Sequence, residues 1–173
     1  MATDKKKKMA KKAPKVQREN VFQDGPHLVT AIICEKVLEE KNGVKTAVRI
    51  VDRFTRTVTS SGPDPDTIPP MTRQLNLLVR FKKGESGSKH DLKLDMINPD
   101  SNSTGTLSQT LVFEGGPDRG IDMVLPLDVQ FDRDGIYWID VYLDEIRVTR
   151  IPMRVIFIFQ RQQTGGANPT PVN

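Results

Sequence analysis

Three aspartates in the segment LDVQFDRDG, residues 127–135, are the residues best placed to do chemistry in this sequence. Calcium takes six to eight oxygen ligands. Asp128, Asp132 and Asp134 can offer carboxylates, joined by Asp64 or Asp66 from a neighbouring loop. A complete EF-hand loop needs further aspartates and a distal glutamate, which this segment lacks. Asp and Gly also turn a chain without binding anything. We therefore favour a turn at residues 132–135 and predict no metal, with calcium-dependent binding as an alternative.

The remaining reactive side chains show no arrangement typical of catalysis. His27 and His90 are isolated, and Asp91, the neighbour of His90, would face the opposite side of a strand. Cys34 lies in an apolar run, where a thiol is usually buried and inert. The glycine-rich segment at residues 114–122 lacks the Lys-Ser/Thr pair of a phosphate loop, and no serine has a nucleophile-elbow context. We predict no catalytic residues and no cofactor, so the protein is not expected to be an enzyme.

Positive charge is concentrated at the N-terminus. Residues 1–19 hold eight Lys and Arg against two acidic residues, which leaves 18 basic and 20 acidic residues in the rest of the chain. A nucleic-acid partner would therefore bind through this arm, by salt-sensitive and sequence-independent contacts, although the arm has no aromatic residues for base stacking. The arm could also sit on an anionic membrane surface. We favour the third possibility, a solubilising extension with no specific partner. The candidate polyanion-binding residues are Lys5, Lys6, Lys7, Lys8, Lys11, Lys12 and Lys15.

Length and composition predict one domain between two tails. The 173 residues include one cysteine, which excludes an intramolecular disulfide, and no apolar run is long enough for a signal peptide or a membrane span. We expect a cytoplasmic protein. Residues 1–20 and 161–173 are polar or rich in Lys, Gly and Pro, so we predict disordered tails around a domain at residues 21–160.

Within the domain, alternating apolar residues predict strands. A hairpin is expected at about 28–39 with 44–54, joined by a type I′ turn at Asn42-Gly43, although CEKVLEEK also suits a helix. Four prolines predict a loop at 57–71. Runs at 73–83 and 89–100 are expected to form a second antiparallel pair. Further strands are expected at 107–114 and before Phe131, where Pro126 favours a kink or a sheet edge. Seven to eight strands indicate an all-β antiparallel sandwich.

The segment GIYWIDVYLDEIRVTRIPMRVIFIF, residues 135–159, predicts the last two strands, with a tight turn at residues 143–146. Gly135, Ile136 and Tyr137 resemble the penultimate strand of immunoglobulin-like sandwiches, where a tyrosine after the turn caps the corner through its hydroxyl. Ile139 stands where many such domains have a cysteine. The resemblance therefore implies the immunoglobulin-like architecture and not an antibody-type domain.

A second resemblance covers residues 27–158, which look like short uncharacterised bacterial proteins of domain-of-unknown-function families. Its pattern is G-x-Y, then L-D-x, then R-x-P-x-x-V. This resemblance implies no activity. The matching residues are Gly135, Tyr137, Leu143, Asp144, Arg150, Pro152 and Val155.

Two strands carry apolar residues on both faces, LVTAII at 28–33 and VIFIF at 155–159. A half-solvated antiparallel strand alternates instead, so loops, tails or another subunit must cover the second face. Our leading hypothesis is a non-catalytic sandwich that works by protein–protein contact, as a homo-oligomer or with another protein. The candidate contact residues are Trp138, Tyr142, Ile156, Phe157, Ile158 and Phe159.

Overall fold

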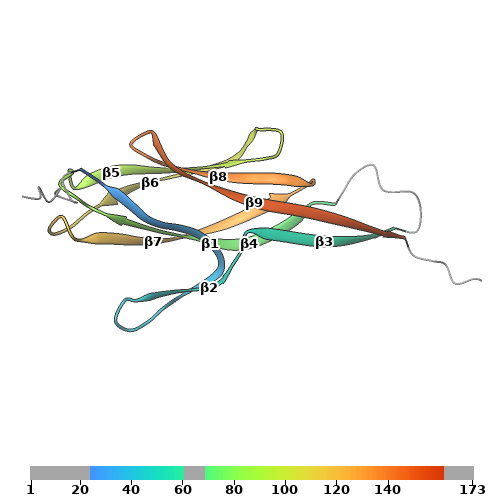
Figure 1. Ribbon diagram of the computed structural model, residues 1–173, viewed down its shortest axis with the longest axis horizontal. Helices are drawn as coiled ribbons and strands as arrows, with labels where there is room; N and C mark the ends of the chain where they lie inside the picture. The colour runs from blue at the N-terminus through green and yellow to red at the C-terminus, as the bar shows by residue number, and fades with distance from the viewer. Residues whose placement is uncertain (1–23, 61–68, 162–173) are drawn as a thin grey trace, which may run out of the picture.

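A computed structural model describes residues 24–60 and 69–161, which form nine strands and no helix. The strands are β1 (His27–Glu39), β2 (Lys45–Ile50), β3 (Arg53–Ser60), β4 (Met71–Lys82), β5 (Lys89–Ile97), β6 (Ser103–Val112), β7 (Gly120–Phe131), β8 (Gly135–Leu143) and β9 (Ile146–Arg161). We call the sheet with strand order β2-β1-β4-β7 sheet A, and the sheet with order β3-β9-β8-β5-β6 sheet B. Figure 1 shows the two layers facing each other.

The predicted first hairpin is present; residues 34–39 of CEKVLEEK are strand rather than helix, and the last two residues lead into the turn. Its turn differs from the prediction, because only Gly43 has a positive φ, of 81°. The Gly43 N–H donates to the Glu40 carbonyl at 2.9 Å, and the Asn42 side chain accepts from the Val44 N–H at 3.1 Å. This geometry is a type I turn followed by a left-handed glycine, so the type I′ prediction was wrong.

The expected strand at 44–54 divides into β2 and β3, which raises the strand number from the predicted seven to eight to nine. The chain leaves sheet A after Ile50 and enters sheet B at Arg53. At the crossing, Arg49 has a φ of 55° and the Val51 N–H donates to the Ile33 carbonyl. Strand β3 then runs parallel to β9 as far as Ser60, so residues 57–60 belong to a strand and not to the predicted loop.

The runs at 73–83 and 89–100 alternate as predicted but do not pair with each other. Strand β4 pairs with β1 and β7 in sheet A, and β5 pairs with β6 and β8 in sheet B. Leu75 and Leu77 on β4 and Leu92 and Leu94 on β5 are all at most 2% exposed. Their apolar faces meet across the core. Alternation in the sequence predicts which face of a strand is buried, but it does not predict which strand is its hydrogen-bonded neighbour. Pro126 lies on β7, an edge strand of sheet A, as its ring requires.

The outward side of β1 is covered in part by the chain itself. Ile33 pairs with Leu77 in the core, so Cys34 and Leu78 point to the other side of sheet A, where they are nonetheless buried. In Figure 1 the β1–β2 hairpin leaves the sandwich and turns back beneath it. The hydrogen bond from Arg80 is the main cause that lowers the pKa of the Asp122 carboxyl on β7. Lys45 on β2 is close enough to Asp122 to lower this pKa further. The hairpin therefore supplies intrachain cover for one of the two strands that are apolar on both faces.

No helix long and apolar enough to cross a membrane occurs in residues 24–60 and 69–161. The predictions for the Lys-rich arm and for the C-terminal tail lie almost entirely outside the described residues.

Candidate functional site

Residues 132–135 form the predicted turn into β8, fastened by Tyr137. The Tyr137 hydroxyl accepts the backbone N–H groups of Asp132 and Arg133 at 3.2 and 3.3 Å, and donates to Asp132 Oδ1 at 2.9 Å. The ring is 3% exposed and meets Phe131 edge-on at 4.9 Å. Gly135 has a φ of 145°, and a Cβ there would lie 2.5 Å from the Pro99 ring. The corner role predicted for Tyr137 is confirmed.

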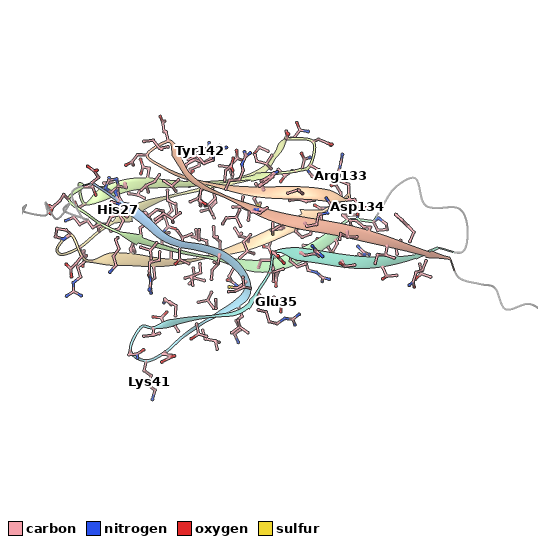
Figure 2. The ribbon with its side chains drawn as sticks, viewed as in Figure 1. His27, Glu35, Lys41, Arg133, Asp134 and Tyr142 are labelled. Atoms are coloured by element: carbon pink, nitrogen blue, oxygen red, sulfur yellow. The ribbon has the colours of Figure 1, made fainter. Side chains whose placement is uncertain are left out.

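Of the three aspartates that suggested a calcium site, Asp132 and Asp134 bind different protein groups. Asp132 binds Arg133 at 2.9 Å, and this contact holds the pKa of the Asp132 carboxyl at about 2. The Asp134 carboxylate accepts the Phe157 N–H of β9, and Asp128 lies opposite Gln74 on the outward side of sheet A. Figure 2 shows Arg133 and Asp134 beside β9. Among residues 24–60 and 69–161, no three His, Cys, Asp or Glu side chains are grouped to hold a metal ion; Asp64 and Asp66 lie outside these residues.

We expect Tyr137→Phe to lower the free energy of unfolding by about 1–3 kcal/mol, because two backbone N–H groups lose their acceptor and the Asp132 carboxylate loses a donor. Tyr142→Phe is the matched control, since its half-buried hydroxyl makes one long contact of 3.3 Å, to Asp140. Urea unfolding of both variants checks the prediction. Equal losses would contradict the corner role.

His90 has a carboxylate partner that sequence reasoning missed. Its Nδ1 lies 2.5 Å from Asp144 Oδ2 and its Nε2 3.0 Å from the Gly87 carbonyl, and its side chain is 10% exposed. This contact lowers the pKa of the Asp144 carboxyl. Asp144 also binds the backbone of Asp91: its Oδ1 accepts the Asp91 N–H, and its own N–H donates to the Asp91 carbonyl. Both ring nitrogens are engaged by acceptors, so the pair fastens the β8–β9 turn to β5. Asp144 is 54 positions away, which is why no local pattern revealed it.

The outward side of β8 carries a buried carboxylate. Asp140 is 1% exposed although its neighbours Ile139 and Val141 point into the core. Arg150, directly opposite on β9, grips it with two bonds, Nε to Oδ1 at 2.6 Å and Nη2 to Oδ2 at 2.7 Å. Arg147 adds a contact at 3.4 Å. These bonds lower the pKa of the Asp140 carboxyl, and the bonds from Arg150 contribute most.

Aromatic rings complete this arrangement. The Arg150 guanidinium carbon lies 5.3 Å from the centre of the Trp138 ring, and Lys93 Nζ lies 5.7 Å from the Tyr142 ring. Arg150 is thus held between a carboxylate and an indole face. We call Trp138, Asp140, Tyr142, Arg147 and Arg150 the aromatic–arginine cluster.

A β-bulge explains why the cluster could not be read from the sequence. The tight turn predicted at residues 143–146 is present, and it pairs Leu143 with Ile146 and Tyr142 with Arg147. Asp144 and Glu145 have the positive φ values, 48° and 66°, of a type I′ turn. Unbroken, this register would place Thr149 opposite Asp140. The bulge between Val141 and Tyr142 shifts the pairing by one residue and brings Arg150 there instead.

The six predicted contact residues divide between two faces. Trp138, Tyr142 and Ile156 are half-buried on the outward side of sheet B, and Ile158 is 43% exposed there. Phe157 is 4% exposed in the core, and Phe159 packs against the core. The side chains of these two phenylalanines do not lie on the outward surface, because alternation along β9 turns them inward with Val155. Ile136, 39% exposed, and the arginines of the cluster belong to the surface and were not predicted.

A cleft of about 750 Å³ lies where the chain crosses between the sheets, near Arg49, Arg53 and Arg73. Its charges do not converge on one point, since Arg49 pairs with Glu35 at 3.3 Å and Asp52 also lines the wall. It is a less defined site than the aromatic–arginine cluster.

Arg150→Met should lower the melting temperature by roughly 5–10 °C, because it leaves the Asp140 carboxylate buried without its main partner. Asp140→Leu should lower it by less than roughly 3 °C, since Arg150 is 40% exposed and can turn to water. The bond lowers the folded-state pKa of Asp140, so its stabilising effect is present above the ordinary carboxyl pKa and is lost as the pH falls through the folded value. The melting temperatures of wild type and Arg150→Met should therefore converge only as the pH falls below the ordinary carboxyl value of 3.8. A larger loss for Asp140→Leu than for Arg150→Met at pH 7 would contradict this.

Comparison with known proteins gives a family without an assigned role. The family of unknown function DUF6941 matches residues 29–156. No curated protein matches the chain. The match covers most of the sequence and both sheets, so the chain belongs to this family.

Proposed function

We propose that this member of the DUF6941 family is a non-catalytic β-sandwich module that works by protein–protein contact, through the outward side of sheet B around the aromatic–arginine cluster. The observation that carries the proposal is the position of Arg150, fixed between the Asp140 carboxylate and the Trp138 ring. The remaining donors of its guanidinium stay open to a partner, because the side chain is 40% exposed.

Trp, Tyr and Arg dominate the residues whose truncation weakens protein interfaces most. A side chain that is already fixed loses little conformational entropy on binding, and this is the main source of affinity in preorganised surfaces. Two bonds from a buried carboxylate fix Arg150, and the same strand pair positions Trp138 beside it. The cluster therefore combines the favoured residue types with the rigidity that makes them effective.

Aliphatic side chains extend this surface. Ile158 is 43% exposed and Ile136 39% exposed, and Ile156 lies between them on the same side of sheet B. Apolar contacts beside an anchored arginine are the usual composition of the centre of an interface. The β1–β2 hairpin gives sheet A an intrachain cover, so sheet B is the better candidate for a partner.

The contacts of the other reactive groups support a role without catalysis. Both ring nitrogens of His90 are engaged by oxygen acceptors, and Asp132 and Asp134 bind protein donors. A general base needs a free nitrogen or carboxylate within reach of a substrate proton. These groups serve the turn into β8 and the turn after it.

The immunoglobulin-like type of the sandwich is part of the proposal. The order β9-β8-β5 in sheet B corresponds to the G, F and C strands of that fold, and the adjacent pair β4 and β7 to its B and E strands. The corner tyrosine, Tyr137, lies on β8, the strand that corresponds to F. The insertion of β2 between β1 and β3 is a departure from that scheme.

Affinity capture from an extract of the cells that encode the protein tests the contact surface. We expect Trp138→Ala bait to retain its partner at least roughly tenfold less than wild type, as truncation of a central tryptophan does. Ile50→Ala is the control, since Ile50 is 66% exposed on β2 of the other sheet. Quantitative mass spectrometry of the retained proteins gives the measurement. If the same proteins are retained equally by all three baits, the cluster is not the contact surface.

A further inference from the structure

Strand β9 extends beyond the strand that borders it. Its pairing with β8 ends at Val155, opposite Gly135, whereas its pairing with β3 continues to Arg161. Figure 1 shows β3 and the end of β9 extending together past the rest of the sandwich. Residues 156–161 thus have a strand neighbour on one side only, among the residues that the structure describes.

The direction of each backbone group on this segment follows from its neighbours. The Arg154 N–H donates to Asp52, so residues 154, 156, 158 and 160 direct their backbone groups to β3. Val155 pairs with Gly135, and the Phe157 N–H donates to the Asp134 carboxylate, so the odd-numbered residues face the other way. The Phe157 carbonyl, both backbone groups of Phe159 and the Arg161 N–H therefore form an edge without a strand partner in the described part of the chain.

Two other edge strands carry residues that discourage pairing, whereas β6, the other edge of sheet B, is uncharged and mostly polar, with Gly105. Strand β7 has Pro126 and Asp122, and β3 has Arg53 and Arg56. Natural sheets use charge, proline and short strands in this way. The β9 segment Ile-Phe-Ile-Phe-Gln, residues 156–160, has no charge, proline or glycine. In the described structure, one bond shields this segment from pairing: the Phe157 N–H donates to the Asp134 carboxylate.

We propose that this edge of β9 pairs antiparallel with the same edge of a second copy of the chain, about a two-fold axis at Phe159. Each Phe159 then exchanges two backbone hydrogen bonds with Phe159 of the partner subunit. Each Phe157 carbonyl accepts the N–H of Arg161 of the partner subunit. In this register the Phe157 carbonyl, both backbone groups of Phe159 and the Arg161 N–H are all hydrogen-bonded. The bond between the Phe157 N–H and Asp134 stays in place.

A second copy is the occupant that the segment fits best. An edge that meets itself across a two-fold axis must not bring like charges together, and residues 156–160 carry none. Ile158, 43% exposed, would be buried beside the axis, and the two copies of sheet B would join into one sheet. This dimer goes beyond the proposed function, since it uses the edge of sheet B and not the aromatic–arginine cluster on its face.

Sedimentation equilibrium of the full chain at micromolar concentration, with three variants, tests the dimer. We expect wild type to be dimeric and Ile158→Lys to dissociate at least tenfold more readily, because two lysines would meet near the axis. Ile146→Lys is the matched control: Ile146 is 69% exposed at the other end of the same strand, and we expect the dimer to persist. Trp138→Ala should also leave the dimer intact, so failure of the contact surface and failure of the dimer are separable.

Amide exchange at Phe159 identifies the occupant in the same samples. Slow exchange in wild type, lost in Ile158→Lys while its strand content by circular dichroism is unchanged, is the expected result. A monomeric wild type would overturn the proposal. If the Phe159 amide of that monomer were protected, and lost its protection on deletion of residues 162–173, the edge would pair with the chain's own C-terminal segment. If the Phe159 amide were unprotected, the edge would be unpaired. A dimer that Ile158→Lys does not weaken would place the interface elsewhere.

Discussion

The outward side of sheet B depends on the ion pair between Asp140 and Arg150. Burying a carboxylate is costly unless its oxygens are bonded, and here both are, by one guanidinium in a two-point grip. Such a pair adds little net stability relative to an apolar pair of the same volume, so its main effect is geometric. It joins β8 to β9 beyond the bulge, and it places the Arg150 side chain over the indole of Trp138.

The two sheets differ in how their outward sides are covered. Sheet A has the β1–β2 hairpin turned back beneath it, and Cys34 and Leu78 on its outward side are buried. Sheet B instead carries a layer of long side chains, with Arg150 and Arg147 over Asp140, and exposed isoleucines along β9 and β8. The proposed contact would use this apolar surface beside a rigid arginine. The asymmetry between the sheets is therefore the structural reason to look for a partner at sheet B.

Sequence patterns predicted the two faces of β8 and the turns at either end of it, because these depend on neighbours in the chain. Alternation along β8 separates Tyr137 and Ile139 from Trp138 and Asp140, and the structure confirms each side. The corner tyrosine and the turn at Asp144-Glu145 follow from residues only a few positions apart.

Long-range pairings escaped prediction, because they depend on which strand lies beside which. Nothing in the run at 44–54 marks the crossing at Asp52, and β4 and β5 show the same alternation whether they pair or face each other. The grip of Arg150 on Asp140 needs a one-residue bulge that no local signal specifies. Asp144 similarly meets His90 only because the turn after β8 folds against β5.

The mobility of the Arg150 side chain tests most directly whether sheet B carries a preformed contact surface. Nitrogen-15 relaxation reports the order parameter of its Nε–H bond, with Arg154, exposed on the same strand, as the internal reference. The ion pair and the stacked indole predict an order parameter for Arg150 above about 0.8, close to that of a rigid backbone. A value below about 0.6, like that of a freely moving side chain, would contradict the preorganised surface on which the proposed function depends.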